Sequence, residues 1–403
     1  MEDLLLLVHR IPYPPNKGDK VRSFHLLRFL TKYFKVHLGC FIDDEKDWEY
    51  EHTLDSFCAS RLVRPLYKSS RKFASLRGFV TGQALTLPYY ADAGMKHWVN
   101  KTIHRYKIRK VVVFSSAMAQ FVMPPHQSLF TIMDFVDVDS DKWRQYAESK
   151  SGLMKWIYQR EAKKLEHYES RVCAKFDKSY FVSKEEADLF KTICKDNQDK
   201  IDYYNNGVDY QFFNPELQMD NPFQAGSRPV MVFSGAMDYW ANIDAVVWFS
   251  AEVLHRIKSK IPNVALYIVG SNPSAEVLKL SEITNVFVTG RVDDVRPYIK
   301  HATLVIAPMR IARGVQNKVL EAMSFNKPIV ATQSALEGIE YCPDFLLQAK
   351  NTAEEFADAC IDIIQNPAVE NKYRNCIIEH YDWQRNLDRL AVPLGITPNN
   401  ANS

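Results

Sequence analysis

The sequence has no apolar run long enough to cross a membrane as a helix. Such a helix needs about 20 consecutive apolar residues, and no segment of the chain approaches that length. Glu2 and Asp3 make the start acidic where a signal peptide would be basic, and the apolar run at 4–8 is far too short for one. We therefore expect a cytoplasmic protein.

Cysteine is sparse and shows no pattern. None of the cysteines forms a C-x-x-C pair; the seven stand at positions 40, 58, 173, 194, 342, 360 and 376. An odd, scattered set predicts reduced thiols and argues against a disulfide framework or a zinc site.

Excess charge and repeated motifs are absent as well. The formal net charge is only +3, too small to argue for nucleic acid, so no nucleic-acid partner is expected. The sequence shows no repeat of roughly 20 to 50 residues and no low-complexity segment. Because no G-x-G-x-x-G follows an expected strand, the chain is a poor fit to a dehydrogenase.

What is present suits two globular domains. A chain of 403 residues is too long for one comfortable core. Its hydrophobic content of 46% and charged content of 25% are ordinary for a soluble globular protein.

The first half alternates short apolar runs with helical patterns. Helices are expected at 21–34 and at 143–173, and the second of these is long and charged. Buried strands are expected at 4–8, 36–42, 111–114, 129–133 and 179–182. Repeated βα units of this kind predict a parallel, doubly wound sheet.

The second half starts the same pattern again after a polar connector at 214–229. A helix is expected at 243–257 and a helical tail at 353–390. Strands are expected at 230–233, 264–269, 286–288, 304–306 and 329–331. The predicted divisions are a Rossmann-like domain at 1–205, a second one at 206–380, and a C-terminal helix and tail at 381–403.

The most informative segment follows the strand expected at 304–306. Its loop holds Arg310 and Arg313, and the helix after it carries Lys318 and Glu321 three residues apart, on one patch of surface. Cations around a helix N-terminus suit a phosphate group, because the backbone N–H groups there are free. A carboxylate on the second turn suits sugar hydroxyls. The combination points to a nucleotide diphosphate.

This segment resembles the donor-binding motif of family-four GT-B glycosyltransferases, in which L-E-A-M is followed by G-K-P-[IV]-V. Residues 320–323 read LEAM and residues 326–330 read NKPIV. Two glutamates stand eight positions apart in that family. Glu321 matches the second, which binds the donor ribose, whereas the first falls on Arg313. A branch of the family carries P-L-R-x-x-x-G-x-x-x-K instead. The residues that match it here are Pro308, Arg310, Gly314 and Lys318.

Across most of its length the chain looks most like the exosortase-associated (PEP-CTERM system) sugar transferases of bacterial exopolysaccharide loci. The stretches that carry this likeness are PNKGDKVRSFHLL, VFSSAMAQ, DFVDVDSDKW, LTLPYY and ARGVQNKVLEAM.

The resemblance implies an α/β protein of GT-B fold, with two Rossmann-like domains facing across a cleft and a C-terminal helix crossing back. It implies a retaining hexosyltransferase with no essential metal and no cofactor beyond a nucleotide-diphosphate sugar, UDP- or GDP-linked. Lys318, Arg310 and Arg313 are the expected catalytic residues, because they would meet the charge that develops on the departing diphosphate. The expected donor-binding residues are Gly18, Ser234, Gly235, Arg291, Gly314, Val315 and Glu321.

Several of these assignments have simpler alternatives. Many family members place arginine and lysine where this chain has Ala236 and Ala241, so the cations are expected to come from the opposite loop instead. Arg313 is alternatively a plain surface charge. The turn around Arg291 is also explained by Asp294 capping a helix. The loop at 12–20, which carries Gly18, is alternatively a solvated proline-rich turn.

The acceptor-side residues are expected to be Lys17, Asp134 and Asp137. The aspartates follow an expected strand, where relatives have histidine then aspartate; here Met133 replaces the histidine. Clustered carboxylates also invite a metal site, but the EF-hand spacing is absent and a D-x-D pair is weak. The alternative is helix capping by Asp139 or Ser140.

A basic stretch at 61–79 contains no acidic residue and interleaves six cations with apolar side chains. Such a stretch is typical of a membrane-surface contact, suited to a polyprenyl-linked or glycan acceptor at the inner face of the cytoplasmic membrane. The alternative is an ordinary strand and helix with a solvated basic face.

Two rival functions remain. A GT-B-fold nucleotide-sugar epimerase would share the donor site but need acid and base groups at the sugar. A non-catalytic scaffold subunit would lose the phosphate-binding cations, and the presence of Arg310, Lys318 and Glu321 argues against it.

Overall fold

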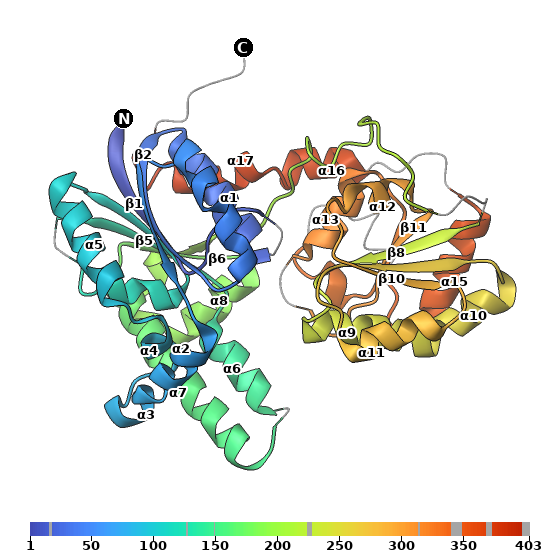
Figure 1. Ribbon diagram of the computed structural model, residues 1–403, viewed down its shortest axis with the longest axis horizontal. Coiled ribbons are helices and arrows are strands. Elements are labelled where there is room, and N and C mark those ends of the chain that lie inside the picture. Colours follow the sequence, from blue (N-terminus) through green and yellow to red (C-terminus); the bar gives the residue numbers. More distant parts are fainter. Residues whose placement is uncertain are drawn as a thin grey trace. The chain divides into compact units, whose positions relative to one another are not determined.

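The computed structural model describes residues 1–15, 18–125, 128–148, 150–223, 228–312, 315–339, 349–367 and 373–396. The chain divides into two compact units, drawn in Figure 1. Unit 1 comprises Met1–Asn205 and Leu387–Ser403, and unit 2 comprises Asn206–Asn386.

Unit 1 is built on a seven-stranded parallel sheet with the order β3-β2-β1-β4-β5-β6-β7. Its strands are β1 (Glu2–Val8), β2 (Phe34–Ile42), β3 (Ser60–Pro65), β4 (Lys110–Phe114), β5 (Phe130–Val136), β6 (Lys178–Phe181) and β7 (Ile201–Tyr203). The centre of the sheet is apolar on both faces, because all five residues from Leu4 to Val8 are fully buried. The chain turns back at β1 and β4, which are neighbours in the sheet but not in the sequence.

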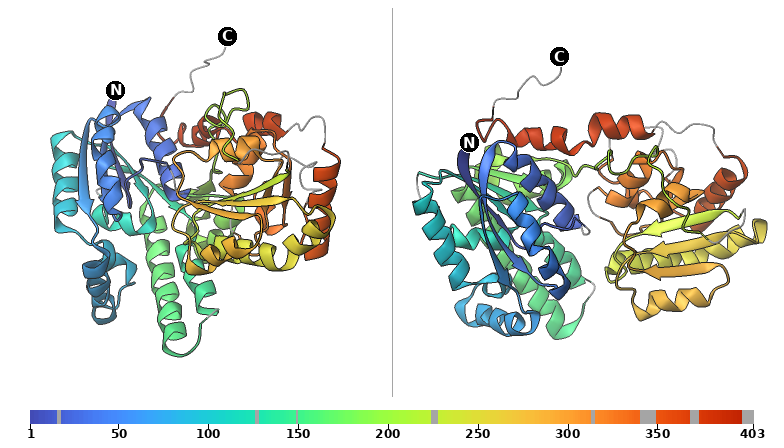
Figure 2. Two further views of the ribbon diagram at one scale, coloured as in Figure 1. Left: turned by 45° about the vertical axis from the view of Figure 1, so that its right-hand side comes forward. Right: turned by 45° about the horizontal axis from the view of Figure 1, so that its top comes forward.

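Helices cover both faces of this sheet, as Figures 1 and 2 show. They are α1 (Gly18–Thr31), α2 (Lys68–Ser75), α3 (Arg77–Thr81), α4 (Thr86–Tyr90), α5 (Ala93–Arg105), α6 (Asp139–Glu148), α7 (Gly152–Lys175) and α8 (Lys184–Ile193), with the 3-10 helices η1 (Glu45–Ser56), η2 (Ser116–Phe121) and η3 (Lys195–Lys200). The doubly wound sheet expected for the first half is confirmed. The strands β3 and β7 were not expected, because edge strands are only partly buried and lack a continuous apolar run.

Unit 2 repeats the architecture with five parallel strands in the order β10-β9-β8-β11-β12. They are β8 (Val230–Ser234), β9 (Ala265–Val269), β10 (Val286–Gly290), β11 (Leu304–Ala307) and β12 (Ile329–Ala331). Each overlaps a strand expected from the sequence. Here the chain turns back between β8 and β11.

The helices of unit 2 pack on both sides of the sheet; Figure 1 shows α9 and α11 on one side, with α12 and α13 on the other. They are α9 (Trp240–Trp248), the π-helical turn η4 (Phe249–Val253), α10 (Leu254–Lys260), α11 (Ala275–Lys279), η5 (Leu280–Glu282), α12 (Arg296–His301), α13 (Asn317–Ser324), η6 (Ser334–Leu336), α15 (Ala353–Gln365), α16 (Tyr373–His380) and α17 (Trp383–Leu387).

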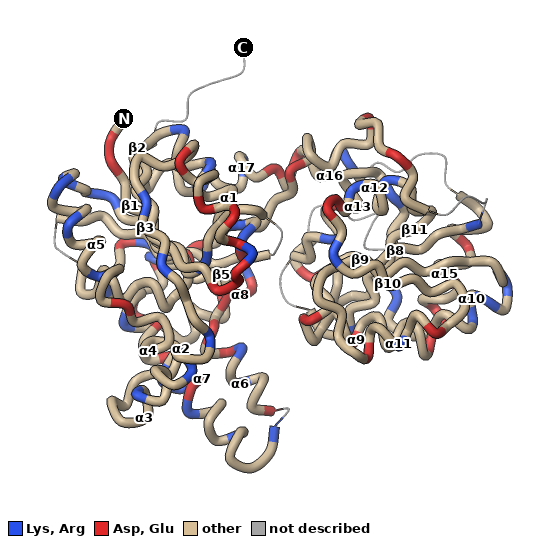
Figure 3. The backbone as a smooth tube through the Cα atoms, in the orientation of Figure 1, with Lys and Arg blue, Asp and Glu red and all other residues tan. Residues whose placement is uncertain are grey.

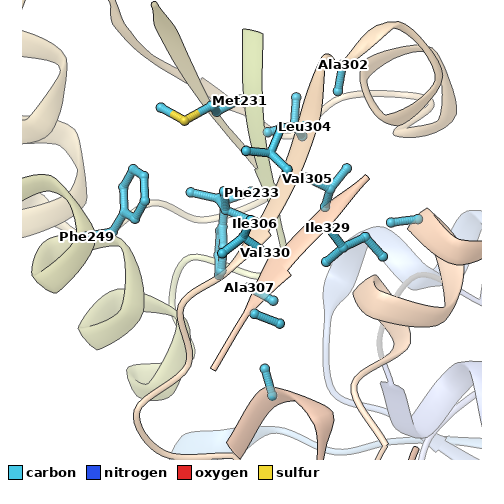
Figure 4. Packing of buried hydrophobic residues seen from close by; sticks show 14 of the residues in the cluster. Met231, Phe233, Phe249, Ala302, Leu304, Val305, Ile306, Ala307, Ile329 and Val330 are labelled. Atoms are coloured by element: carbon cyan, nitrogen blue, oxygen red, sulfur yellow. The ribbon is translucent and has the colours of Figure 1, made fainter. Parts of the chain in front are cut away.

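The core of unit 2 is continuous across its middle strands. Figure 4 shows Phe233 of β8, Ile306 of β11 and Val330 of β12 packed side by side, and all three are at most 1% exposed. The uninterrupted burial of these strands holds the ends of β8 and β11 in fixed positions.

The last described segment belongs to unit 1. After α17, the 3-10 helix η7 (Asp388–Leu390) brings Arg389 to β7, where its guanidinium donates to the carbonyl oxygen of Tyr203 at 3.3 Å. The hydroxyl of Tyr180 in turn donates to the Arg389 carbonyl oxygen at 3.4 Å. The sequence placed the corresponding boundary after residue 380, six residues before the division at Asn386 and Leu387.

The cysteines depart from expectation at one position. Cys376 on α16 is disulfide-bonded, so the expectation that every cysteine is a reduced thiol is wrong there. The thiols that are free are Cys40, Cys58, Cys173, Cys194 and Cys360. Pairing depends on distance in the folded chain, which scattered sequence positions do not reveal.

Candidate functional site

The candidate donor site lies in unit 2, where the order of the strands reverses. In an open parallel sheet, ligands bind beyond the carboxyl ends of the strands at this position, because the loops there diverge. The loop after β8 runs from Gly235 to Tyr239, and the loop after β11 begins at Pro308. The residues that converge here come from both loops and from the helices α9 and α13.

Two glycines allow the strand ends of β8 and β9 to meet backbone to backbone. A Cβ atom on Gly270 would lie 1.6 Å from the carbonyl oxygen of Gly235. A Cβ atom on Gly235 would lie 2.7 Å from the side-chain nitrogen of Asn242 and 3.3 Å from Nζ of Lys318. No side chain fits at either position, so both glycines are required by close packing.

Lys318 is the central side chain of the site. It stands on the first turn of α13, is 8% exposed, and donates from Nζ to Oδ1 of Asn242 at 2.6 Å. Its Nζ atom also lies 3.7 Å from Sδ of Met309 and 4.1 Å from the ring centroid of Phe233. The amide of Asn242 is itself fixed, because it donates to the carbonyl oxygen of Ala236 at 2.9 Å. Three elements thus hold one buried ammonium group.

Burial sets the charge of this group. It lowers the pKa of Lys318 to about 7, and the charge of Glu321 opposes this only in part. Burial likewise raises the pKa of Glu321, one turn along α13, to about 7, with Lys318 opposing. An incoming phosphate would favour the charged form of Lys318, so the site is able to take up a proton when an anion binds.

Arg310, in the loop after β11, is anchored to α9, the helix that also carries Asn242. Its Nε donates to Asp244 at 3.0 Å and a second guanidinium nitrogen donates to the other carboxylate oxygen. This hydrogen bond raises the pKa of Arg310. The side chain is half exposed. Arg310 therefore reaches α9 through Asp244, two residues from the Asn242 that holds Lys318.

The remaining donor assignments are scattered. Ser234 and Val315 are buried, whereas Arg291 is exposed after β10. Asp294 accepts from the backbone N–H of Arg296 at 2.9 Å just before α12, whereas the N-cap residue of that helix is Val295. Gly18 is the first residue of α1 in unit 1, and a Cβ there would meet no atom within 4 Å. Arg313, Gly314 and Lys17 lie outside the described residues.

On the acceptor side, Asp134 is committed to the interior of unit 1. Its carboxylate accepts from Arg22 at 3.0 and 3.1 Å and also from the hydroxyl of Tyr204. The guanidinium lies 3.6 Å above the Tyr204 ring. All three residues are at most 1% exposed. This is an internal ion pair, in which the Asp134 carboxylate is buried and fully engaged.

Asp137, by contrast, directly follows β5 and is partly exposed. Its carboxylate accepts from Lys142 on α6, which also lies 3.9 Å from Asp139. Asp139 and Ser140 form the first turn of α6, and Asp139 accepts from the Ser116 hydroxyl at 3.0 Å.

The sequence analysis missed two residues at these sites. In unit 1, His9 follows β1 at the strand reversal, with Nε2 3.2 Å from Asp19; its position directly after the first strand was the available signal. The His9 hydrogen bond and the Arg10 charge outweigh burial and hold the pKa of Asp19 well below its usual range. In unit 2, Asn242 was missed because an uncharged residue next to Ala241 carries no signal.

The comparisons with known proteins concern the fold and the class of enzyme. Residues 228–366 match the family described as "Glycosyl transferases group 1". No curated protein sequence matches the chain. Solved structures match it across nearly the whole length. The sucrose-phosphate synthase of Thermosynechococcus elongatus has a TM-score of 0.69 at 16% identity, covering 98% of both chains.

Two further structures are similar. HepE from Anabaena in complex with UDP-glucose has a TM-score of 0.66 at 13% identity, covering 98% of this chain and 100% of that one. WaaG, a glycosyltransferase involved in lipopolysaccharide biosynthesis, has a TM-score of 0.58 at 14% identity, covering 97% and 98%. The fold is therefore GT-B, and the protein is a glycosyltransferase. Among the described residues, no helix combines the length and hydropathy needed to cross a bilayer.

Proposed function

We propose that the protein is a retaining hexosyltransferase that moves a hexose from a nucleoside-diphosphate sugar to a hydroxyl of a glycan or polyprenyl-linked acceptor in exopolysaccharide assembly. The observation that carries this proposal is the buried Lys318, held by Asn242 at the strand reversal of unit 2. A desolvated ammonium beside a helix N-terminus is suited to an anionic group such as a diphosphate.

In the proposed reaction the bond between the sugar C1 and the diphosphate oxygen breaks, and the acceptor oxygen bonds to C1 on the same face. The acceptor proton passes to the departing diphosphate. Lys318 stabilises the negative charge that builds up on this leaving group, because its interaction strengthens as the charge develops. Protein cations thereby take the part that a divalent metal takes in other transferases, with Arg310 and Arg313 assigned to the same task.

Glu321 is proposed to bind the donor ribose. It lies one turn after Lys318 on α13, so a diphosphate at the lysine would place the ribose near this carboxylate. The donor is proposed to be UDP- or GDP-linked; the solved complex of HepE with UDP-glucose favours UDP. Ser234, Gly235, Val315 and Arg291 remain proposed donor contacts, and Asp137 a proposed acceptor contact.

The experiment that tests the proposal is thermal unfolding of the purified protein against UDP-, GDP-, ADP- and dTDP-sugars and the free nucleotides. A ligand that binds only the native state raises the unfolding temperature. At a ligand concentration about one hundred times Kd, the free energy of unfolding rises by about 2.7 kcal/mol. We expect a shift with the UDP series. No shift with any nucleotide at millimolar concentration would contradict the donor site.

Product analysis distinguishes the proposed transferase from the alternative, an epimerase. With a nucleotide sugar and no acceptor, a transferase leaves the sugar configuration unchanged and releases at most free sugar and nucleotide. An epimerase would yield a second sugar. Isotope-labelled donor followed by NMR distinguishes the two, and the anomeric signal of the glycoside product tests retention.

A further inference from the structure

Exposed apolar side chains are concentrated on two segments of unit 1. Of the 17 large hydrophobic residues that are exposed among the described residues, seven lie within 67–80 and 153–156. These segments are Tyr67 with the helices α2 and α3, and the first five residues of α7. We call the seven residues the α2–α7 surface: Tyr67, Phe73, Leu76, Val80, Leu153, Met154 and Trp156.

The two segments touch one another and form one surface. The ring of Phe79 stacks on that of Trp156, with centroids 6.2 Å apart and planes 8° from parallel. Arg160 of α7 lies 4.7 Å from the Phe79 ring centroid and donates to the carbonyl oxygen of Gly78 at 2.6 Å. Arg160 also donates to the carbonyl oxygen of Gln83 at 3.1 Å. The helices α3 and α7, which carry part of this surface, are therefore joined by direct contacts, and α2 packs beside α3.

A buried carboxylate fixes the base of this surface. Glu161 of α7 accepts from the backbone N–H of Leu85 at 2.6 Å and from that of Thr86 at 3.0 Å. It is fully buried, so the attachment of α7 to the start of α4 is shielded from solvent. The apolar side chains stand on a fixed support, not on a frayed terminus.

Positive charge surrounds these apolar residues. No acidic residue occurs between Arg61 and Ala91, and the nearby Asp92 is already paired with Arg64 and Arg71. Four further cations are exposed and have no carboxylate partner among the described residues: Lys72, Arg77, Lys155 and Lys164. Figure 3 shows basic positions along α2, α3 and α7.

We propose that the α2–α7 surface binds an anionic phospholipid bilayer. The helix α2 has eight residues, none of them buried, and would be about 12 Å long, against the roughly 30 Å of a hydrocarbon core. A short amphipathic helix with exposed phenylalanine and lysine lies in the headgroup region, where its apolar side chains reach the acyl boundary. Trp156 adds a side chain that favours this interface.

The charge pattern decides between a lipid and a protein partner. Unpaired lysines and arginines around exposed aromatic residues match a surface of negative headgroups, where each cation contributes to binding. Protein interfaces are instead depleted in lysine at their centres. This inference goes beyond sugar transfer, since it holds or fails whatever the donor and acceptor are.

The test is sedimentation of the full-length protein with vesicles of phosphatidylcholine alone or of phosphatidylcholine and phosphatidylglycerol at 7:3. We expect binding to the anionic vesicles only, and its loss in 0.5 M NaCl because salt screens the attraction. The double substitution of Lys72→Glu and Arg77→Glu should lower the partition coefficient by about 25-fold or more, at about fivefold per cation. The double substitution of Phe73→Ser and Leu153→Ser should lower the partition coefficient at least about tenfold.

The controls are equally exposed residues elsewhere on unit 1. Lys101→Glu with Lys175→Glu matches the charge change, and Val392→Ser tests the loss of a single exposed apolar side chain outside the α2–α7 surface. All variants should melt as the wild type does and bind nucleotide equally well, so a defect in folding or in the donor site is seen separately. Binding lost in both test variants and kept in the controls supports the proposal.

Two results would overturn it. The first is a wild type that sediments with neither vesicle, or test variants that bind as tightly as the controls. The second is self-association of the wild type in gel filtration that both test variants abolish, with no vesicle binding. That second outcome would make the surface an interface between copies of the chain.

Discussion

The Nζ atom of Lys318 on α13 lies 2.6 Å from Oδ1 of Asn242 on α9. A cation from the helix after β11 is therefore held by the helix after β8, across the point where the sheet reverses. Asn242 thus gives Nζ of Lys318 an oxygen acceptor within the chain. A diphosphate entering the site either joins this hydrogen bond or replaces it.

Changing the charge of the residue at position 242 should shift the pKa of Lys318. Asn242→Asp places a carboxylate beside Nζ and should raise the pKa of Lys318, because an opposite charge favours the ammonium form. Asn242→Ala removes the acceptor and should lower it. The pH dependence of kcat/KM should shift to the alkaline side in the first variant and to the acid side in the second. Equal profiles would show that Asn242 does not position Lys318.

Removing the lysine should affect turnover more than folding. We expect Lys318→Ala to lower kcat by about 10²-fold or more, since a preorganised group that stabilises a leaving charge is lost. The melting temperature should not fall, because burying an ammonium group costs free energy. Lys260→Ala, an exposed lysine at the end of α10, is the matched control. Full activity in Lys318→Ala would remove the residue from the mechanism.

Nucleotide affinity should fall as the pH rises above 7. Burial lowers the pKa of Lys318 to about 7, and the negative charge of a bound diphosphate would raise it. Between these two values the protein must take up a proton to bind, so affinity decreases with pH, by at most tenfold per unit. Calorimetry with UDP in buffers of different ionisation enthalpy measures this uptake.

Glu321 titrates in the same range, so its contribution has to be separated. Glu321→Gln removes that titration and should keep the proton uptake of Lys318. Lys318→Arg remains charged throughout and should abolish the uptake. A pH-independent affinity in the wild type would show that Lys318 does not change its charge on binding.

Three glycine substitutions should give three different results. Gly270→Ala puts a methyl group 1.6 Å from a backbone oxygen and should destabilise the protein by several kcal/mol, about 4 or more, because the backbone itself must move. Gly235→Ala meets the side chain of Asn242 instead, so its effect should include loss of nucleotide binding. Chemical denaturation and UDP binding measure both quantities.

Gly18→Ala is the matched control for stability, because its Cβ meets nothing within 4 Å; we expect a change within about 0.5 kcal/mol. It also tests the donor-binding role that the sequence resemblance implies for Gly18. If a ligand approaches the backbone there closely, affinity for donor or acceptor falls while the melting temperature stays unchanged. Unchanged affinity would leave Gly18 without a role in binding.

Asp134 should behave as a structural residue. Asp134→Asn breaks a buried ion pair with Arg22 and should destabilise the protein by about 3–5 kcal/mol, since an uncompensated charge stays in the interior. Asp137→Asn, at the partly exposed pair with Lys142, should cost under about 1 kcal/mol. Denaturation curves compare the two. A stable Asp134→Asn protein with a raised KM for acceptor would return Asp134 to the acceptor site.

The sequence predicts those parts of the fold in which a residue's surroundings follow from its neighbours in the chain. Residues 4–8 form the central strand because five apolar residues in succession suit a position buried on both faces. The position of Lys318 at the head of α13 follows from the spacing of a local motif. The two-domain pattern was visible for the same reason, since each βα unit is local.

What the sequence could not predict depends on contacts between distant segments. Arg22 lies on a helix expected to be amphipathic, and nothing local shows that it pairs with Asp134, 112 positions away. Asn242 is 76 positions from Lys318 and carries no charge. The disulfide at Cys376 was missed for the same reason. The edge strands β3 and β7 were missed because they are only partly buried and lack a continuous apolar run.

The close approach of Gly235 and Gly270 has a consequence for motion. Because the carbonyl oxygen of one glycine occupies the space of a side chain on the other, the segments after β8 and β9 cannot slide past each other. The N–H of Gly270 also donates to Gly290 at 3.2 Å, so the end of β10 is linked as well. Any backbone movement of the segment after β8 must therefore displace the ends of β9 and β10 as well, so the three strand ends are expected to move as one unit.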